Sequence, residues 1–332
     1  MGHAKTLLIL TRLRAGAPFR QRIEPYLEPL TARGVSWKVV EMSKWPLQRR
    51  AEMLEARHYR AVLLHRKTLT AWDATAMREA RRLIYDVDDA VMHQARASEE
   101  PHGGRLRRFR RTVARADLVI AGAPVLAEEA RQAGALDVRI VPTGLDTRLY
   151  PRKQTYAADG PVRLVWIGSS STLKQLDLLQ PVLQALGRAM PDLILRVIAD
   201  GEFKVSGLKV ENVRWSPEME ARLLAESNVG IAPLPDTPYT RGKCGFKVLQ
   251  YMAAGLPVVA SPVGVNADYV RPDATGYLAR TADEWVTTVK KLAGDAELRA
   301  RLGLAGRSRV VEEFDFSVLA PKVCDLIEET ME

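Results

Sequence analysis

Two lysines, each placed shortly after an apolar run, are the residues of this chain best suited to bind phosphate. Lys247 lies in the stretch Gly-Phe-Lys-Val-Leu-Gln, at the start of an expected helix, and Gln250 follows three residues later. Lys174 follows Gly168, Ser169 and further small hydroxyl residues. Backbone N–H groups at a helix start favour an anion, and a lysine adds a positive charge. Gln250 would share the helix face of Lys247 and reach a sugar hydroxyl, so the pattern predicts a nucleoside diphosphate site.

The plainer alternative is a capped helix with solvated lysines. A lone match to a phosphate-binding loop is often false. Both lysines, however, follow strands of the same expected sheet, where the loops meet at one edge. This shared position favours the phosphate site. Lys174 and Lys247 are its candidates for catalysis, and Gly168, Ser169 and Gln250 are candidates for binding the substrate that carries the diphosphate, here called the donor.

A second group of candidates consists of the aspartates in Tyr-Asp-Val-Asp-Asp, after a strand of the first half. We interpret Asp86 and Asp89 as residues that bind the hydroxyl groups of a second substrate, here called the acceptor. Asp88 is the best available general base. Coordination of a divalent metal and capping of the next helix are the alternatives. We expect no metal, because Lys174 and Lys247 already supply the positive charge that a metal would provide.

Arg14, Gly16 and Arg20 follow the first strand and form a bent, basic loop. They are candidates for binding an anionic acceptor, and a solvated surface loop is the alternative.

The distribution of net charge along the chain also favours an anionic partner. Of the net +9, residues 1–155 contribute 29 Lys and Arg against 17 Asp and Glu, which is +12, and the remainder contributes −3. A basic half suggests an anionic partner.

The segment 105–115 holds six arginines around Leu106, Phe109 and Val113, which recur at helical spacing. Such a helix could contact an anionic membrane surface, or it could bury its three apolar residues in a core. Nucleic acid is not expected as a partner, because aromatic residues are not interleaved with the charge.

The elements that position these residues alternate between short apolar runs and helical patterns, which predicts parallel sheets covered by helices. A polar segment with prolines, residues 151–161, reads as a linker. The fold class is therefore α/β, with two doubly wound, Rossmann-like domains facing a central cleft, residues 1–155 and 160–312. No apolar run is long enough to span a bilayer, no signal peptide is expected, and two cysteines make no metal pattern, so we expect a cytoplasmic protein.

With these residues in view, the chain resembles the family-4 glycosyltransferases of the GT-B fold. The stretch from Gly245 to Ser261 is similar to the donor-binding helix of that family, although Gln250 stands where the family has a glutamate. Ser169 likewise replaces an arginine. The resemblance implies donor contacts from Trp215, Lys243 and Phe246 as well. It also implies that a last helix, residues 317–332, packs back on the N-terminal domain.

The function that the resemblance implies is transfer of a hexose-type sugar from a nucleoside diphosphate to a glycan, lipid-linked or small-molecule acceptor. The resemblance further implies retention of configuration and no metal, with a cytoplasmic location that can include the inner face of a membrane. One alternative is a nucleotide-sugar epimerase, which needs a general base pair near the sugar that the motif lacks. The other is a non-catalytic binding or scaffold protein, suggested by Gln250 and Ser169.

Overall fold

The computed structural model describes residues 5–94, 103–157 and 160–332. The chain divides into two compact units. The N-terminal unit contains Met1–Gly144, Thr237–Cys244 and Phe316–Glu332, and the C-terminal unit contains Leu145–Asp236 and Gly245–Asp315. The N-terminal unit thus includes a short segment, residues 237–244, that lies far away in the sequence and that the sequence analysis assigned to the C-terminal domain.

The N-terminal unit is built on a six-stranded sheet in which every pair of neighbours is parallel, in the order β2-β1-β3-β4-β5-β6. Because the strands are parallel, all their carboxyl ends lie along one edge of the sheet. The register places His65 opposite Asp86 at that edge. The strands are β1 (Thr6–Thr11), β2 (Ser36–Glu41), β3 (Ala61–His65), β4 (Leu83–Val87), β5 (Leu118–Ala121) and β6 (Val138–Ile140).

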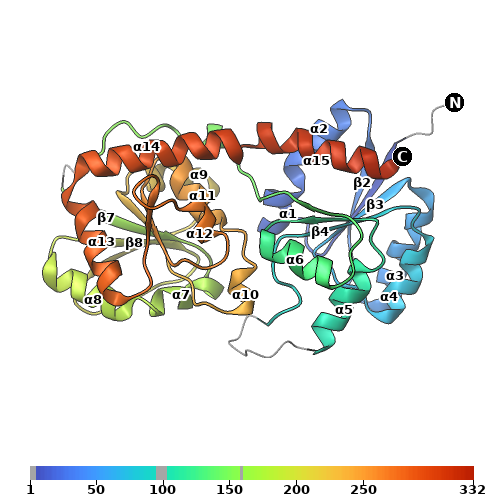
Figure 1. Cartoon of the computed structure of the whole chain (residues 1–332), viewed down its shortest axis with the longest axis horizontal. Helices are drawn as coiled ribbons and strands as arrows, with labels where there is room; N and C mark the ends of the chain where they lie inside the picture. The colour runs from blue at the N-terminus through green and yellow to red at the C-terminus, as the bar shows by residue number, and fades with distance from the viewer. Residues whose placement is uncertain (1–4, 95–102, 158–159) are drawn as a thin grey trace. The chain divides into compact units, whose positions relative to one another are not determined.

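Helices follow these strands, and the last helix of the chain belongs to this unit. One continuous helix is expected over residues 20–32, but a 3-10 turn at Glu24–Tyr26 divides it, because Pro25 cannot donate a backbone hydrogen bond. The C-terminal helix lies beside α2 in Figure 1, and its Leu319, Val323 and Ile327 share the core of this unit. The helices are α1 (Ala17–Arg22), α2 (Leu27–Ala32), α3 (Pro46–Leu54), α4 (Ala71–Ala76), α5 (Gly103–Val113), α6 (Pro124–Gln132), α10 (Pro238–Arg241) and α15 (Phe316–Met331).

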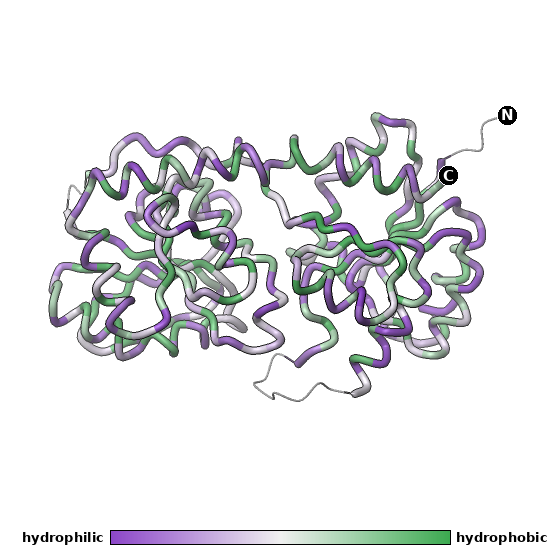
Figure 2. Tube along the Cα trace, viewed as in Figure 1, coloured by the Kyte–Doolittle hydropathy of each residue, from purple (hydrophilic) through white to green (hydrophobic). Residues whose placement is uncertain are grey.

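The C-terminal unit repeats the design with a parallel sheet in the order β12-β11-β10-β7-β8-β9. Strands β8 and β10 are buried along their whole lengths, and Trp166 of β7 is among the largest fully buried side chains. In Figure 2 hydrophobic colouring accordingly follows central strands in each unit. The strands are β7 (Arg163–Ile167), β8 (Ile194–Ala199), β9 (Lys209–Arg214), β10 (Val229–Ala232), β11 (Val258–Ala260) and β12 (Gly276–Leu278).

Two helices matter most for the candidate site, namely α9, which follows β9, and α11, which precedes β11. Among the residues that the structure describes, no helix is long and apolar enough to cross a membrane. The helices of the C-terminal unit are α7 (Lys174–Asp177), α8 (Gln180–Ala189), α9 (Pro217–Ala225), α11 (Phe246–Ala253), α12 (Asn266–Tyr269), α13 (Ala282–Gly294) and α14 (Ala296–Glu313).

Candidate functional site

The start of α11 and the loop after β7 meet through a lysine and a glutamine. The Nζ atom of Lys247 lies 3.1 Å from Oε1 of Gln175 and 4.2 Å from the centre of the Trp166 ring. Gly245 makes the entry to α11 with a φ of 62°, and a Cβ there would come within 2.9 Å of Tyr269. The starts of α7 and α11, whose bonded residues are 72 positions apart in the sequence, are thereby joined at one edge of the sheet.

The loop after β7 keeps the small residues that the phosphate interpretation requires. A Cβ on Gly168 would lie 2.4 Å from the Trp166 ring, so only glycine fits there. The Ser169 hydroxyl lies 2.8 Å from that of Ser171. Lys174 begins α7 as an exposed residue, and within the described part of the chain its ammonium group pairs with no carboxylate. It is therefore a cation available to a ligand.

Gln175, the second residue of α7, is a residue of this site that the sequence analysis missed. It is buried, whereas Lys174 is exposed. Its side chain holds the Lys247 ammonium group at the carboxyl edge of the sheet. No local pattern distinguishes this glutamine, because its partner is remote in the sequence.

Helix α9 also contacts α11, through the side chain of Glu220. The Glu220 carboxylate accepts three hydrogen bonds, from Nε2 of Gln250 at 2.6 Å, from the Tyr150 hydroxyl at 2.5 Å and from Nε1 of Trp215 at 2.7 Å. Burial, and next the charge of Glu220, raise the pKa of Tyr150, so its hydroxyl stays a donor. Two predicted donor-binding residues, Trp215 and Gln250, are brought together by a carboxylate that the sequence analysis missed.

The remaining predicted donor residues divide between the two units. Phe246 is the first residue of α11 and adjoins Lys247. Lys243 belongs to the segment 237–244 of the N-terminal unit, and its Nζ lies 4.8 Å from the centre of the Tyr239 ring. Within the C-terminal unit, the structure groups Phe246 with Lys247 and Gln250 on one helix.

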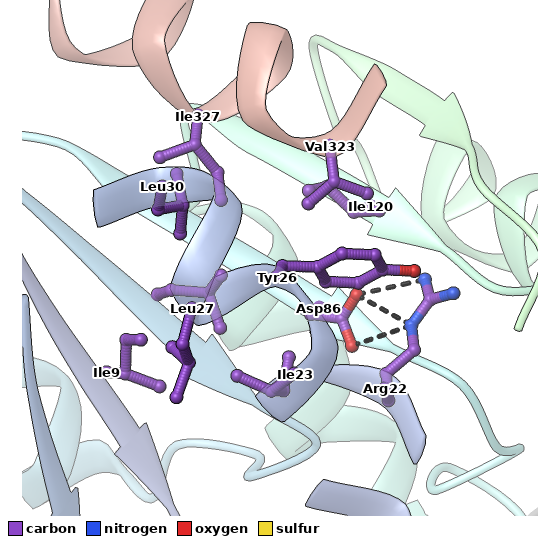
Figure 3. A pocket seen from close by; sticks show the side chains of 11 residues that line it. Ile9, Arg22, Ile23, Tyr26, Leu27, Leu30, Asp86, Ile120, Val323 and Ile327 are labelled. Carbon is purple, nitrogen blue, oxygen red and sulfur yellow. Dashed lines mark hydrogen bonds and ion pairs between the residues drawn. The ribbon is translucent and has the colours of Figure 1, made fainter. Parts of the chain in front are cut away.

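Asp86, at the end of β4, forms a buried ion pair with Arg22. Nε of Arg22 donates to both carboxylate oxygens, at 3.1 and 3.2 Å, and another guanidinium nitrogen of Arg22 donates to the carbonyl of Val141 at 2.6 Å. Figure 3 shows this pair beside the Tyr26 ring in a small pocket lined largely by apolar side chains. The expected acceptor contact through Asp86 is corrected here, since Asp86 is buried and both of its oxygens are taken by Arg22.

Asp88 and Asp89 lie next to Arg66, whose backbone has a φ of 58°, a region that non-glycine residues rarely adopt. Arg66 pairs with Asp88 at 3.0 Å and with Asp89 at 2.6 Å. Burial raises the pKa of Asp88 against the opposing charge of Arg66, which suits a residue that accepts a proton. The segment 237–244 contacts the same loop, because the thiol of Cys244 donates to the Asp88 carbonyl at 3.0 Å and the Tyr239 hydroxyl donates to Asp89 at 3.3 Å.

His65, Asp86 and Asp88 offer ligand atoms that lie within 4.8 Å of one another, which is close enough for a metal ion. His65 is buried, and burial lowers its pKa to about 4. Both carboxylates, however, already bind a guanidinium, from Arg22 and Arg66. A divalent ion would have to displace one of them, so the arrangement is that of an ion-pair network.

The other expected features of the N-terminal unit lie on its surface. Arg14 and Arg20 are exposed on either side of Gly16, which directly precedes α1, and the backbone N–H of Arg14 donates to Glu41. In α5, Phe109 and Val113 are buried. This arrangement favours the core-facing alternative for residues 105–115, because the side that would insert into a membrane packs on the protein.

Comparisons with known proteins agree with this geometry. Residues 161–295 match the family described as Glycosyl transferases group 1. The D-inositol 3-phosphate glycosyltransferase of Nocardia farcinica is 31% identical over 222 residues, which are 58% of this chain and 48% of that protein. The chain thus spans about half the length of the curated relatives it matches.

Two solved structures share the fold across nearly the whole chain. Sucrose-phosphate synthase from Thermosynechococcus elongatus aligns with a TM-score of 0.77 at 17% identity, covering 98% of each chain. Anabaena HepE in complex with UDP-glucose aligns with a TM-score of 0.74 at 15% identity, covering 98% of this chain and 99% of that one.

Two parallel six-stranded sheets of this order define a protein of the GT-B fold. The family match and the similarity to named glycosyltransferases are more specific. Residues 161–295 match the group 1 glycosyltransferases, and the donor-helix motif within them resembles the family-4 type.

Proposed function

We propose that this protein transfers a hexose-type sugar from a nucleoside diphosphate sugar to an acceptor, with retention of configuration. The observation that carries the proposal is the contact of Lys247 with Gln175, which unites the start of α11 with the loop after β7. Lys174 begins the next helix of that loop and is exposed. These two cations are suited to a departing diphosphate, which gains negative charge as its bond to the sugar breaks.

Each group then has a defined part in the reaction. The bond between the anomeric carbon and the diphosphate oxygen breaks, and a bond to the acceptor oxygen forms. The proton of the acceptor hydroxyl moves to the departing diphosphate, whose charge Lys174 and Lys247 balance without a metal. The first N–H groups of α11 have no acceptor within the helix and add a partial positive charge.

The nucleoside end of the donor fits the Glu220 cluster. Trp215 is half-buried and presents an indole ring to a base, while Glu220 holds that ring and Gln250 in place. A carboxylate suits the ribose, because its oxygens accept hydrogen bonds from hydroxyl groups. Glu220 would supply the negative charge that Gln250 lacks where the family has a glutamate.

For the acceptor we propose an anionic molecule held by the N-terminal unit. Arg14 and Arg20 supply positive charge, and Asp88 and Asp89 supply oxygens for an acceptor hydroxyl. The name of the Nocardia farcinica relative describes an acceptor that carries a phosphate, and the basic composition of residues 1–155 agrees with such a class. Both cysteines are buried and free, which favours the reducing cytoplasm as the location.

The test is donor binding and turnover by Lys247→Ala, with Lys291→Ala as the matched control. Lys291 also lies over an aromatic ring, 4.7 Å from that of Tyr277, so its loss removes a similar contact away from the proposed site. A panel of nucleotide sugars is first screened by thermal shift, since a ligand that binds only the folded state stabilises it by RT ln(1 + L/Kd), where L is the free ligand concentration. We expect Lys247→Ala to lower turnover about 100-fold or more, and Lys291→Ala to leave it unchanged.

Equal turnover by the two variants would overturn the role of Lys247. Tight donor binding without product for any acceptor would instead support the non-catalytic alternative. Conversion of the donor to an epimer in the absence of acceptor would support the epimerase alternative.

A further inference from the structure

Four large apolar side chains are exposed on one side of the N-terminal unit. Leu13 is 56% exposed, Trp45 76%, Leu47 77% and Trp72 41%. They follow β1, β2 and β3, which are adjacent parallel strands, so all four lie at the carboxyl edge of one sheet. We name these four residues the Trp45 patch. The other exposed large apolar side chains that the structure describes in this unit belong to residues 125–140, whereas these four lie at the ends of adjacent strands. Such a concentration of exposed apolar area marks an interaction surface.

Hydrogen bonds hold the segments that carry the patch next to one another. The N–H of Arg14, beside Leu13, donates to Glu41 at the end of β2 at 2.9 Å. Arg50 of α3 donates to the carbonyl of Trp72 at 2.9 Å. Arg49 donates to the Lys44 carbonyl at 3.2 Å and to the Asp73 carboxylate at 3.0 Å. The start of α3, which carries Trp45 and Leu47, is therefore fixed against the start of α4.

The charge around the patch is positive. Arg12, Arg14 and Lys44 are exposed in the same loops, and Lys67 is partly exposed after β3. Asp73 is buried and is neutralised by Arg49 and Lys67. Two acids accompany these bases: Glu41 is exposed, and Glu52 is partly exposed and accepts from the Ser43 N–H at 2.8 Å. Apolar side chains within a basic rim match a surface that is apolar inside and negatively charged outside.

We propose that the Trp45 patch docks the protein on an anionic lipid bilayer. Tryptophans favour the boundary between headgroups and acyl chains, and basic residues are attracted to anionic headgroups. Helix α5 supplies arginines but no inserting side, because its Phe109 and Val113 are buried. The Trp45 patch therefore supplies the apolar contact and replaces residues 105–115 as the docking surface.

A glycan partner fits the patch less well than a bilayer does. Sugars stack on the open faces of aromatic rings, but the Arg50 guanidinium lies over the Trp72 ring at 5.2 Å. Leu13 and Leu47 offer no ring for stacking. The transfer of aliphatic side chains of this size from water into hydrocarbon instead lowers the free energy.

The experiment is co-sedimentation of the full chain with vesicles of phosphatidylcholine, alone or mixed with phosphatidylglycerol. We expect binding to the mixed vesicles that weakens with salt, and little binding to phosphatidylcholine alone. The variant W45S with L47S should lower the partition coefficient about tenfold or more, because it removes two inserting side chains. The matched control is L136S, since Leu136 is 97% exposed but lies outside the patch.

The proposal is overturned if wild-type protein ignores the mixed vesicles, or if the double variant binds them as tightly as L136S does. It is also overturned if the double variant keeps vesicle binding but loses binding to dextran sulfate, which would make the patch a glycan site. Binding to vesicles requires no sugar donor, so this result is independent of the proposed transferase activity. Urea unfolding of each variant checks that the fold is intact.

Discussion

Replacing Glu220 by alanine removes the acceptor that Tyr150, Gln250 and Trp215 share. Tyr150 and Gln250 are each only 5% exposed. A buried donor without a partner costs about 1–3 kcal/mol, so two of them cost about 2–6 kcal/mol of the free energy of unfolding. Glu220 itself is partly exposed, so water can enter the vacated space. We therefore expect a loss near the lower end, about 2 kcal/mol.

Exchanging the two side chains separates this cluster from a general loss of stability. Gln250→Glu alone would set two carboxylates where an amide now donates at 2.6 Å, which is strongly unfavourable. Combining it with Glu220→Gln restores one carboxylate facing one amide. The double variant should be more stable than the sum of the single changes predicts, by about 1 kcal/mol or more.

The assay is urea unfolding followed by circular dichroism, together with calorimetric titration of UDP and GDP. Glu218→Ala is the control, because Glu218 is an exposed residue in the same first turn of α9 and should cost less than about 1 kcal/mol. The reasoning is refuted if Glu220→Ala costs no more than Glu218→Ala. Nucleotide binding that is unchanged in Glu220→Ala would refute the ribose contact alone.

Two further predictions concern the N-terminal unit. Burial lowers the pKa of His65 from 6.5 to about 4, so the folded state resists protonation and stability should fall as the pH drops from 6.5 towards 4. His65→Gln should remove up to about 3 kcal/mol of this pH-dependent loss of stability. The measurement is the free energy of unfolding of both proteins at several pH values between 6.5 and 4. An identical pH dependence in the two proteins would contradict the buried, neutral state of His65. Arg22→Met leaves Asp86 buried without its partner and should cost about 3–5 kcal/mol in urea unfolding. The exposed Arg78→Met should cost less than about 0.5 kcal/mol, and a similar cost for both variants would argue against the buried ion pair.

The sequence by itself indicated the alternation of strands and helices, the two sheets and the helix that carries Lys247, but not the edge strand β12. Largely apolar runs such as Ala61–His65 and Leu118–Ala121 form strands that are buried throughout, because a strand buried on both faces needs mainly apolar side chains. Gly245 and the helical pattern after it likewise fix the start of α11, since a left-handed residue there favours glycine. The break at Pro25 could have been predicted as well, from the missing N–H of proline.

Tertiary structure decided which polar side chains meet. Glu220 is an ordinary helix residue in the sequence, and its role appears only when α9 is set beside Gln250, 30 residues away. Asp86 resembles its neighbours Asp88 and Asp89, but Arg22, 64 residues away, fixes it in the core. Local patterns depend on backbone geometry and hydrophobicity, which neighbouring residues share. The partner of a polar group depends instead on the packing of distant elements, and the low dielectric of the interior makes that pairing decisive.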